Sequence, residues 1–410
     1  MASRQPLPPT TRFLAFREFA RTEAFAGVLL MAFAAVALVW ANIPDLAEAY
    51  NSLFTLDKDA AWLTVDLPLS EKTKPLILWI NDGLMALFFF LVGLEIKREV
   101  LSGELNEPRK ASLAIFAAIG GMAVPAMFYY FTAMGNSAAV EGWGIPMATD
   151  IAFALGIMAL VGSRAPVVLK VFLTAVAIVD DLGAVLVIAL FYTAKLNVVA
   201  LLIGLAVLAI LWVMSSKIDL PIIAYALLGI VVWYAFLLSG VHATIAGVLV
   251  AMTVPMRTLA NGKSMLYTME HGLHPWVAYL VLPIFALANA GVGLAGGIDM
   301  GSPVTLGIIL GLMIGKPIGV MVMSWIAVKT GIAALPAGVG WMQIFGVAIL
   351  TGVGFTMSLF IASLAFTEVP AFVDEAKIGI LAASIGMGLI GYLVLRLTSP
   401  APVATPLAAV

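Results

Sequence analysis

The sequence lacks cysteine altogether and has few charged residues. Its 410 residues include no cysteine, 11% charged residues and a formal net charge of -2. Without cysteine there are no disulfides or thiolate metal sites, and the redox compartment cannot be read. Soluble domains carry about 25% charged residues, so this chain lacks the polar surface to face water on every side. The charge balance also argues against a nucleic-acid partner. With 63% hydrophobic residues, the chain is predicted to be one membrane-embedded unit.

Long apolar runs recur along the chain. About 20 apolar residues in a helix span the hydrocarbon core of a bilayer. The sequence predicts an all-α membrane protein with about twelve such spans, at residues 23–42, 76–98, 111–133, 141–162, 168–194, 198–215, 220–237, 240–254, 276–293, 303–328, 340–364 and 376–397. The stretch 216–256 is the hardest to divide, because its two helices are short and almost fused.

The basic residues predict the orientation. With the N-terminus inside, most of the 21 Lys and Arg residues fall in inner segments, as cytoplasmic loops require. Lys316 lies within a span, and those in outer segments are Lys58, Lys72, Lys74, Lys195 and Lys377. We therefore predict a cytoplasmic N-terminal tail (1–22), a single transporter domain (23–397) and a disordered, Pro-rich cytoplasmic C-terminal tail (398–410). The first apolar run is too long for a signal peptide, so it is interpreted as an uncleaved helix.

Two further features concern architecture. The outer loop after the first span, residues 43–75, contains a weakly alternating segment that predicts a small β-hairpin able to pair with another subunit. Spans 141–162 and 340–364 are each interrupted by Gly or Pro. Such interruptions at matching places predict an inverted-topology repeat, with spans 3–5 related to spans 10–12.

The adjacent Asp180 and Asp181 lie near the centre of an apolar span. A charge at this depth costs at least about 2.5–3.5 kcal/mol on insertion scales. Two carboxylates this close in a low dielectric cannot both ionise freely, so they should titrate as a unit. Such a pair suits proton-coupled binding of a hard cation such as Na⁺ or Li⁺. The structural alternative is a salt-bridged pair that locks helices together.

Three more polar residues are predicted to join this site. If the helix breaks around residues 146–150, the Thr149 hydroxyl and unwound carbonyls become available to a cation, and Asp150 offsets half-helix dipoles. Lys316 lies far from either end of its span, which argues against snorkelling. It could neutralise half-helix C-termini or pair with one of the two aspartates. If it pairs with Asp180, Na⁺ or a proton would compete with it.

Other polar residues have weaker signals. Glu95 lies beside other charges at a cytoplasmic helix end, where an ordinary interfacial role is also reasonable. Glu270, His271 and His274 are predicted to lie at a cytoplasmic mouth, as pH-sensing groups or as a solvated loop. Asp82 and His242 are interpreted as structural intramembrane residues, and no His–Glu spacing suggests zinc.

These residues occur within motifs that resemble the NhaA family of Na⁺/H⁺ antiporters over nearly the whole chain. The motifs are NDGLMA (81–86), FLVGLEIKRE (90–99), ATDIAFALG (148–156), VAIVDDLG (176–183), GVHAT (240–244), EHGLHPW (270–276), FALANAG (285–291), GKP (315–317) and GFTMS (354–358). This family is a known case of transporters built from inverted-topology repeats, so the predicted repeat of spans 3–5 and 10–12 and the resemblance rest on the same pattern.

The resemblance implies twelve helices, with spans four and eleven unwound and crossing beside the aspartate helix. It implies Na⁺ or Li⁺ held chiefly by Asp181 with Asp180 and Thr149 nearby, a Lys316–Asp180 ion pair, and dipole balance by Asp150 and Lys316. It links Glu95 and Glu270 with pH activation. It further implies electrogenic exchange without a cofactor, a homodimer formed through the outer hairpin, and a location in the bacterial inner membrane.

The sequence leaves two alternatives to Na⁺/H⁺ antiport. An intramembrane aspartyl protease would use two carboxylates to activate water, but such enzymes carry a Gly-x-Gly-Asp motif that this sequence lacks. A proton-coupled transporter of another small solute would need polar or aromatic groups sized for a larger ligand. Na⁺/H⁺ antiport is therefore the favoured function.

Overall fold

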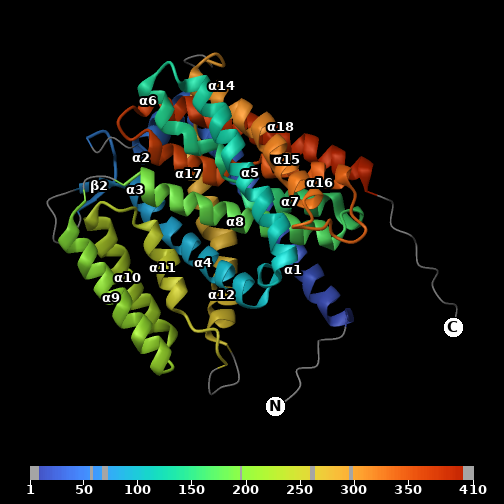
Figure 1. Cartoon of the computed structure of the whole chain (residues 1–410). Coiled ribbons are helices and arrows are strands. Elements are labelled where there is room, and N and C mark those ends of the chain that lie inside the picture. Colours follow the sequence, from blue (N-terminus) through green and yellow to red (C-terminus); the bar gives the residue numbers. More distant parts are fainter. Residues whose placement is uncertain are drawn as a thin grey trace, which may run out of the picture.

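A computed structural model describes residues 9–55, 59–66, 73–193, 196–258, 264–294 and 299–399. Outside these residues lie the predicted disordered tail beyond Ser399, residues 1–8 of the predicted N-terminal tail, and Lys58, Lys72 and Lys195. The described chain is mostly helical, with one small antiparallel sheet (Figure 1).

Nine helices of the described residues are long and apolar enough to cross a membrane. They are α1 (Pro9–Asn42), α3–η1–α4 (Leu76–Trp79, Ile80–Leu84, Met85–Ser102), α5 (Pro108–Ala133), α8 (Val167–Phe191), α9 (Val198–Lys217), α10 (Ile222–Ser239), α12–η5–α13 (Met265–Trp276, Val277–Val281, Leu282–Asn289), α14–η6–α15 (Pro303–Leu310, Gly311–Gly315, Lys316–Lys329) and α18 (Pro370–Thr398). The shorter elements are α2 (Pro44–Leu53), η2 (Glu104–Asn106), η4 (Gly162–Arg164) and α11 (Thr244–Thr253).

Two further spans are broken, as the glycines and prolines predict. Helix α6 (Ser137–Val140) and η3 (Glu141–Met147) precede α7 (Ile151–Val161), with a bend of 44°. Helix α16 (Trp341–Thr351) precedes α17 (Phe355–Ala365), with a bend of 42°. The two breaks contact each other, because the Asp150 N–H donates to the Val353 carbonyl at 2.7 Å. Counting each bent pair as one crossing gives eleven candidate spans in the described residues.

Helices α5 and α15 cross where Gly120 of α5 meets Gly319 of α15. A Cβ atom added at Gly120 would overlap the carbonyl of Gly319, and one added at Gly319 would overlap the carbonyl of Gly120. Only glycine permits two helix backbones to approach this closely. This contact holds α15, and therefore Lys316, near the middle of the molecule.

Helix α15 begins directly after the π-helical turn η6. Pro317, at its start, has no N–H to donate to a preceding carbonyl.

The ends of two predicted spans differ from the structure. The ninth span was predicted to start at residue 276, but its helix begins at Met265. The hydropathy pattern did not include residues 265–275, about three turns of the helix, because Glu270, His271 and His274 interrupt the apolar run. These residues therefore lie on the helix and not in a loop before it. The first helix also begins earlier, at Pro9.

The predicted hairpin is present as β1 (Thr64–Asp66) and β2 (Thr73–Pro75). The strands pair antiparallel, with Val65 opposite Lys74. The side chains of β1 are exposed, and in the described residues no third strand pairs with this sheet.

Tyr50 of α2 fastens the segment after α13. Its hydroxyl donates to the Leu287 carbonyl at 2.8 Å and accepts the Gly291 N–H at 3.0 Å. Burial raises the pKa of Tyr50, so the phenol stays protonated and continues to donate. The Lys377 ammonium of α18 donates to the Gly291 carbonyl at 3.0 Å, which joins the same segment to a third element.

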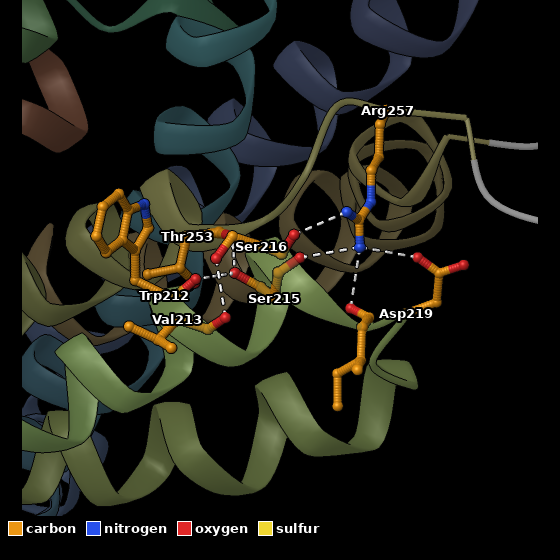
Figure 2. A network of polar contacts seen from close by, with 8 residues as sticks. Trp212, Val213, Ser215, Ser216, Asp219, Thr253 and Arg257 are labelled. Atoms are coloured by element: carbon orange, nitrogen blue, oxygen red, sulfur yellow. Dashed lines mark hydrogen bonds and ion pairs between the residues drawn. The ribbon is translucent and has the colours of Figure 1, made fainter.

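Helices α9 and α10 pack side by side at one edge of the molecule (Figure 1). Arg257 caps the C-terminal end of α9 by donating to the carbonyls of Ser215, Ser216 and Ile218 at 2.9–3.2 Å, and it pairs with Asp219 at 3.0 Å (Figure 2). The Ser215 hydroxyl also donates to the Thr253 carbonyl at 2.8 Å, which ties α9 to the end of α11. Arg257 is thus occupied by helix capping.

Candidate functional site

Asp180 of α8 is fully buried and carries an ion pair. The Lys316 ammonium lies 2.7 Å from Asp180 Oδ2, and both side chains have no exposed surface. The Thr149 hydroxyl donates to the same oxygen at 2.6 Å. Lys316 also donates to the Met147 carbonyl, at the end of η3. Asp180 therefore joins α8 to α15 and to the first broken helix through one carboxylate oxygen.

The Thr149 hydroxyl also links the two broken helices. It lies 2.9 Å from the Thr351 carbonyl, at the C-terminal end of α16. A hydroxyl has one proton to donate, so the Thr351 carbonyl and Asp180 share it. This carbonyl is one of the groups that an unbroken helix would have satisfied internally.

Asp150 lies next to Thr149 but serves different groups. Its Oδ1 accepts the Phe153 N–H at 2.9 Å, which caps the N-terminus of α7. Its Oδ2 accepts the Thr356 N–H at 3.0 Å and the Thr356 hydroxyl at 2.6 Å, at the N-terminus of α17. A negative charge is favourable at helix N-termini, and here one carboxylate serves two. Asp150 is thus a shared cap, with both oxygens occupied.

Asp181 differs from both neighbours. It is 1% exposed, and within the described residues neither of its carboxylate oxygens has a hydrogen-bond partner. It lines a cavity of about 90 Å³, large enough for several water molecules at about 10–15 Å³ each. A buried carboxylate without a donor is costly unless a cation or a proton joins it. The geometry therefore leaves Asp181 available to a small ligand.

A cluster of charges borders the same cavity. Glu95, Arg98, Glu270 and His274 all contribute to its wall. Arg98 pairs with Glu270 at 3.1 Å and with Glu99 at 2.8 Å. The structure thus brings Glu95, Glu270 and His274 into one cavity with Asp181.

Three other residues singled out in the sequence lie elsewhere. His271 is exposed, and its Nδ1 lies 2.9 Å from the Tyr267 carbonyl, outside the cavity wall. Asp82 pairs with Lys74 of β2 at 2.7 Å. His242 Nε2 lies 2.6 Å from the Tyr192 carbonyl at the end of α8. The last two contacts hold elements together.

The sequence reasoning missed Thr351, Thr356 and Arg98. Thr356 offered one signal, because it follows the break of its helix closely, as Thr149 and Asp150 follow theirs. The Thr351 carbonyl carries no such signal, since any residue at the end of α16 would present one. Arg98 was noted only as part of a charged helix end.

Comparisons with known proteins identify the family of the chain. Residues 17–395 match the family described as Na⁺/H⁺ antiporter 1. The chain is 50% identical over 397 residues to the Na(+)/H(+) antiporter NhaA of Rhodospirillum rubrum, covering 94% of this chain and 97% of that protein. It is 51% identical over 401 residues to Na(+)/H(+) antiporter NhaA 1 of Erythrobacter litoralis, covering 97% of each.

A third relative is the Na(+)/H(+) antiporter NhaA of Shewanella oneidensis, 51% identical over 381 residues, with 92% of this chain and 96% of that protein covered. The family consists of transporters, which are not enzymes and need no cofactor. The match extends across the broken helices, the aspartate helix and the charged cavity. The chain therefore belongs to the Na⁺/H⁺ antiporter 1 family.

Proposed function

We propose that this protein exchanges Na⁺, and also Li⁺, for protons by alternating access at Asp180 and Asp181. The observation that carries the proposal is the contrast between the two aspartates. Asp180 is neutralised by Lys316 at 2.7 Å, whereas Asp181 faces a cavity with both oxygens unpartnered among the described residues. Carboxylate, hydroxyl and carbonyl oxygens are the ligands that hard cations favour.

The two carboxylates have different roles in this proposal. Asp181 is the chief ligand of the cation, and Thr149 and the Thr351 carbonyl, which lie on the Asp180 side of the site, are further ligands. Asp180 is the switch, bound in turn by Lys316 and by a proton or the arriving cation. Because protons and Na⁺ require the same carboxylates, one excludes the other. The occupied site faces one side of the membrane, the protein changes conformation, and the cargo leaves on the other side.

Asp150 and Lys316 also balance the broken helices. Asp150 accepts the N–H groups at the start of α7 and α17. Lys316 donates to the Met147 carbonyl at the end of η3. Positive and negative helix ends near mid-membrane would otherwise be unsatisfied. Their neutralisation leaves the net charge of the site to be set by the cargo.

The membrane arrangement follows the same proposal. The eleven candidate spans become twelve if the short apolar helix α11 also crosses. Both termini are then cytoplasmic, as the distribution of Lys and Arg favours, and spans 3–5 form an inverted repeat of spans 10–12. The protein would reside in the bacterial inner membrane, with the cavity open to the cytoplasm.

We also propose pH regulation, net charge movement in each cycle and a homodimer. Glu95, Glu270 and His274 border the cavity through which the cation arrives, so their protonation changes its field. The exchange moves more protons in than Na⁺ out. The β1–β2 hairpin supplies an exposed strand edge for a second subunit.

The proposal is tested by replacing Asp181 with Asn in proteoliposomes. Wild-type protein is expected to move protons when Na⁺ or Li⁺ is added, with a rate that depends on pH. Asp181→Asn should abolish this response, because an amide cannot supply the charge that holds Na⁺. Asp45→Asn, at an exposed carboxylate of α2, is the matched control and should stay active. Full activity in Asp181→Asn would remove Asp181 from the assigned role.

A further inference from the structure

Thr174 lies on the same face of α8 as Asp181. The two residues are seven positions apart, which is about two turns and about 10.5 Å along a helix axis. Ile178 lies between them, and all three line the same cavity. Thr174 therefore contributes a hydroxyl to the wall of the cavity at a different depth from the aspartate pair.

The hydroxyl of Thr174 is available to a ligand. A threonine inside a helix commonly donates to the carbonyl four residues earlier. Thr132 does so in α5, where its hydroxyl lies 2.7 Å from the Phe128 carbonyl. Within the described residues, by contrast, the structure gives the Thr174 hydroxyl no such partner. The other threonine of the cavity wall, Thr356, already donates to Asp150 at 2.6 Å.

Glu95 of α4 lines the same cavity as Thr174. Val92 and Ile96 of α4 pack against Ile178 of α8. In the proposed topology α4 and α8 cross in opposite directions. Glu95, between Val92 and Ile96, is then level with this contact, and Thr174 lies about one turn of α8 to its cytoplasmic side.

Much of the cavity wall is apolar, including Ile178 between Thr174 and Asp181. Phe88, Leu91, Leu155 and Ile178 contribute to its wall. A cation passing such a wall loses water ligands and gains few in return. An oxygen placed before this stretch would replace one of the lost ligands.

We propose that Thr174 is a substrate-positioning residue of the cytoplasmic entry path, whose hydroxyl oxygen, with the Glu95 carboxylate, holds a partly dehydrated Na⁺ before it reaches Asp181. The proposal rests on the proposed exchange function and on the cytoplasmic opening of the cavity. It assigns Thr174 a role in capturing Na⁺ from one side only. The chemistry at Asp181 and release on the other side do not involve it.

The test compares Thr174→Val, which removes the hydroxyl and keeps the branched shape, with Thr174→Ser, which keeps the hydroxyl. Exchange is measured in proteoliposomes of known orientation, with Na⁺ varied first on the cytoplasmic face and then on the opposite face. Thr174→Val should raise the apparent KM for cytoplasmic Na⁺ about threefold to tenfold. This is the change expected when the cation loses one ligand whose net contribution equals that of a typical hydrogen bond. The maximal rate and the KM from the other face should not change, and Thr174→Ser should match wild type.

Two controls make the result decisive. Thr132→Val is the same chemical change at a threonine outside the cavity wall and should leave both KM values unchanged. Thr174→Ala leaves room for a water molecule and should give a smaller rise than Thr174→Val, and it decides the matter if the valine variant does not fold. An unchanged cytoplasmic KM in the folded variants, or an equal rise from both faces, would overturn the proposal. Loss of Na⁺-dependent exchange in the wild type would instead refute the proposed function.

Discussion

Asp180 and Asp181 are neighbours in the chain, yet they meet different surroundings. Adjacent residues of a helix point about 100° apart. Asp180 points toward Lys316 and Thr149, whereas Asp181 points into the cavity. A rotation of about 100° around the helix thus separates a paired carboxylate from an available one, as the proposed division of roles requires.

The Lys316–Asp180 pair makes a prediction about stability. Removing one partner of a buried ion pair leaves an uncompensated charge and costs about 3–5 kcal/mol. Lys316→Met should therefore lower the melting temperature of the purified protein. Lys316→Met with Asp180→Asn should be destabilised less than Lys316→Met alone, because no buried charge is left over.

Lys329→Met is the control for this experiment. Lys329 lies at the exposed end of the same helix, so its replacement should change the melting temperature little. Equal melting temperatures for Lys316→Met and wild type, measured by thermal unfolding in detergent, would show that the pair contributes nothing to stability.

At the residue scale, the sequence indicated which charges are buried but not all of their partners. The acids and Lys316 stand out because charged residues are rare in apolar spans. The contact between Asp150 and Thr356 joins residues 206 positions apart, and it depends on how two broken helices cross. No local pattern encodes such a distance. The Lys316–Asp180 pair was anticipated as one option from the residues and more firmly from the family resemblance.

At the scale of elements, the crossing of α5 and α15 depends on two glycines. Gly120→Ala should force the helices apart, because the new Cβ would overlap the Gly319 carbonyl. Such overpacking typically costs about 1–3 kcal/mol. The measurements are the melting temperature and the exchange rate, which should both fall because Lys316 is carried on α15.

Gly135→Ala is the matched substitution for this crossing. A Cβ at Gly135 would meet no atom within 4 Å, so this variant should behave as wild type. If both alanine variants melted at the wild-type temperature, the close approach of α5 and α15 would not matter for stability.

The elements themselves could largely be predicted. Gly and Pro located both broken spans, because they remove or weaken the bonds of a continuous helix. The start of α12 could not be found in this way, since Glu270 and His274 make the segment look like a loop. The π-helical turns η1, η5 and η6 could not be predicted either. An apolar run has the same hydropathy pattern whether or not one turn contains an extra residue.

At the scale of the whole molecule, the β1–β2 hairpin is the feature that can be tested for assembly. Replacing residues 64–75 by a short Gly-Ser link should convert a dimer to a monomer if the exposed strand edge joins two subunits. Light scattering after size-exclusion chromatography measures the mass. Exchange in proteoliposomes should persist, because no residue of the cavity lies in this segment. A shortened protein that remains dimeric would place the interface elsewhere.

The membrane character of the whole chain was evident from composition, and its orientation was predicted from Lys and Arg. Assembly was not predictable to the same degree. Composition reports how much surface avoids water, but lipid and a second subunit can cover the same apolar surface. Among the described residues, the hairpin can distinguish the two, because a two-stranded sheet can be extended by a strand of another subunit.

The shared cap at Asp150 has a mechanical consequence. Helices α7 and α17 both begin on the oxygens of this one side chain. Rotating either half-helix by itself would strand N–H groups in a medium that offers no replacement. Helices α7 and α17 are therefore expected to tilt together, with Asp150 as their common point of attachment. Asp150 is therefore expected to couple the movements of α7 and α17 in addition to balancing charge.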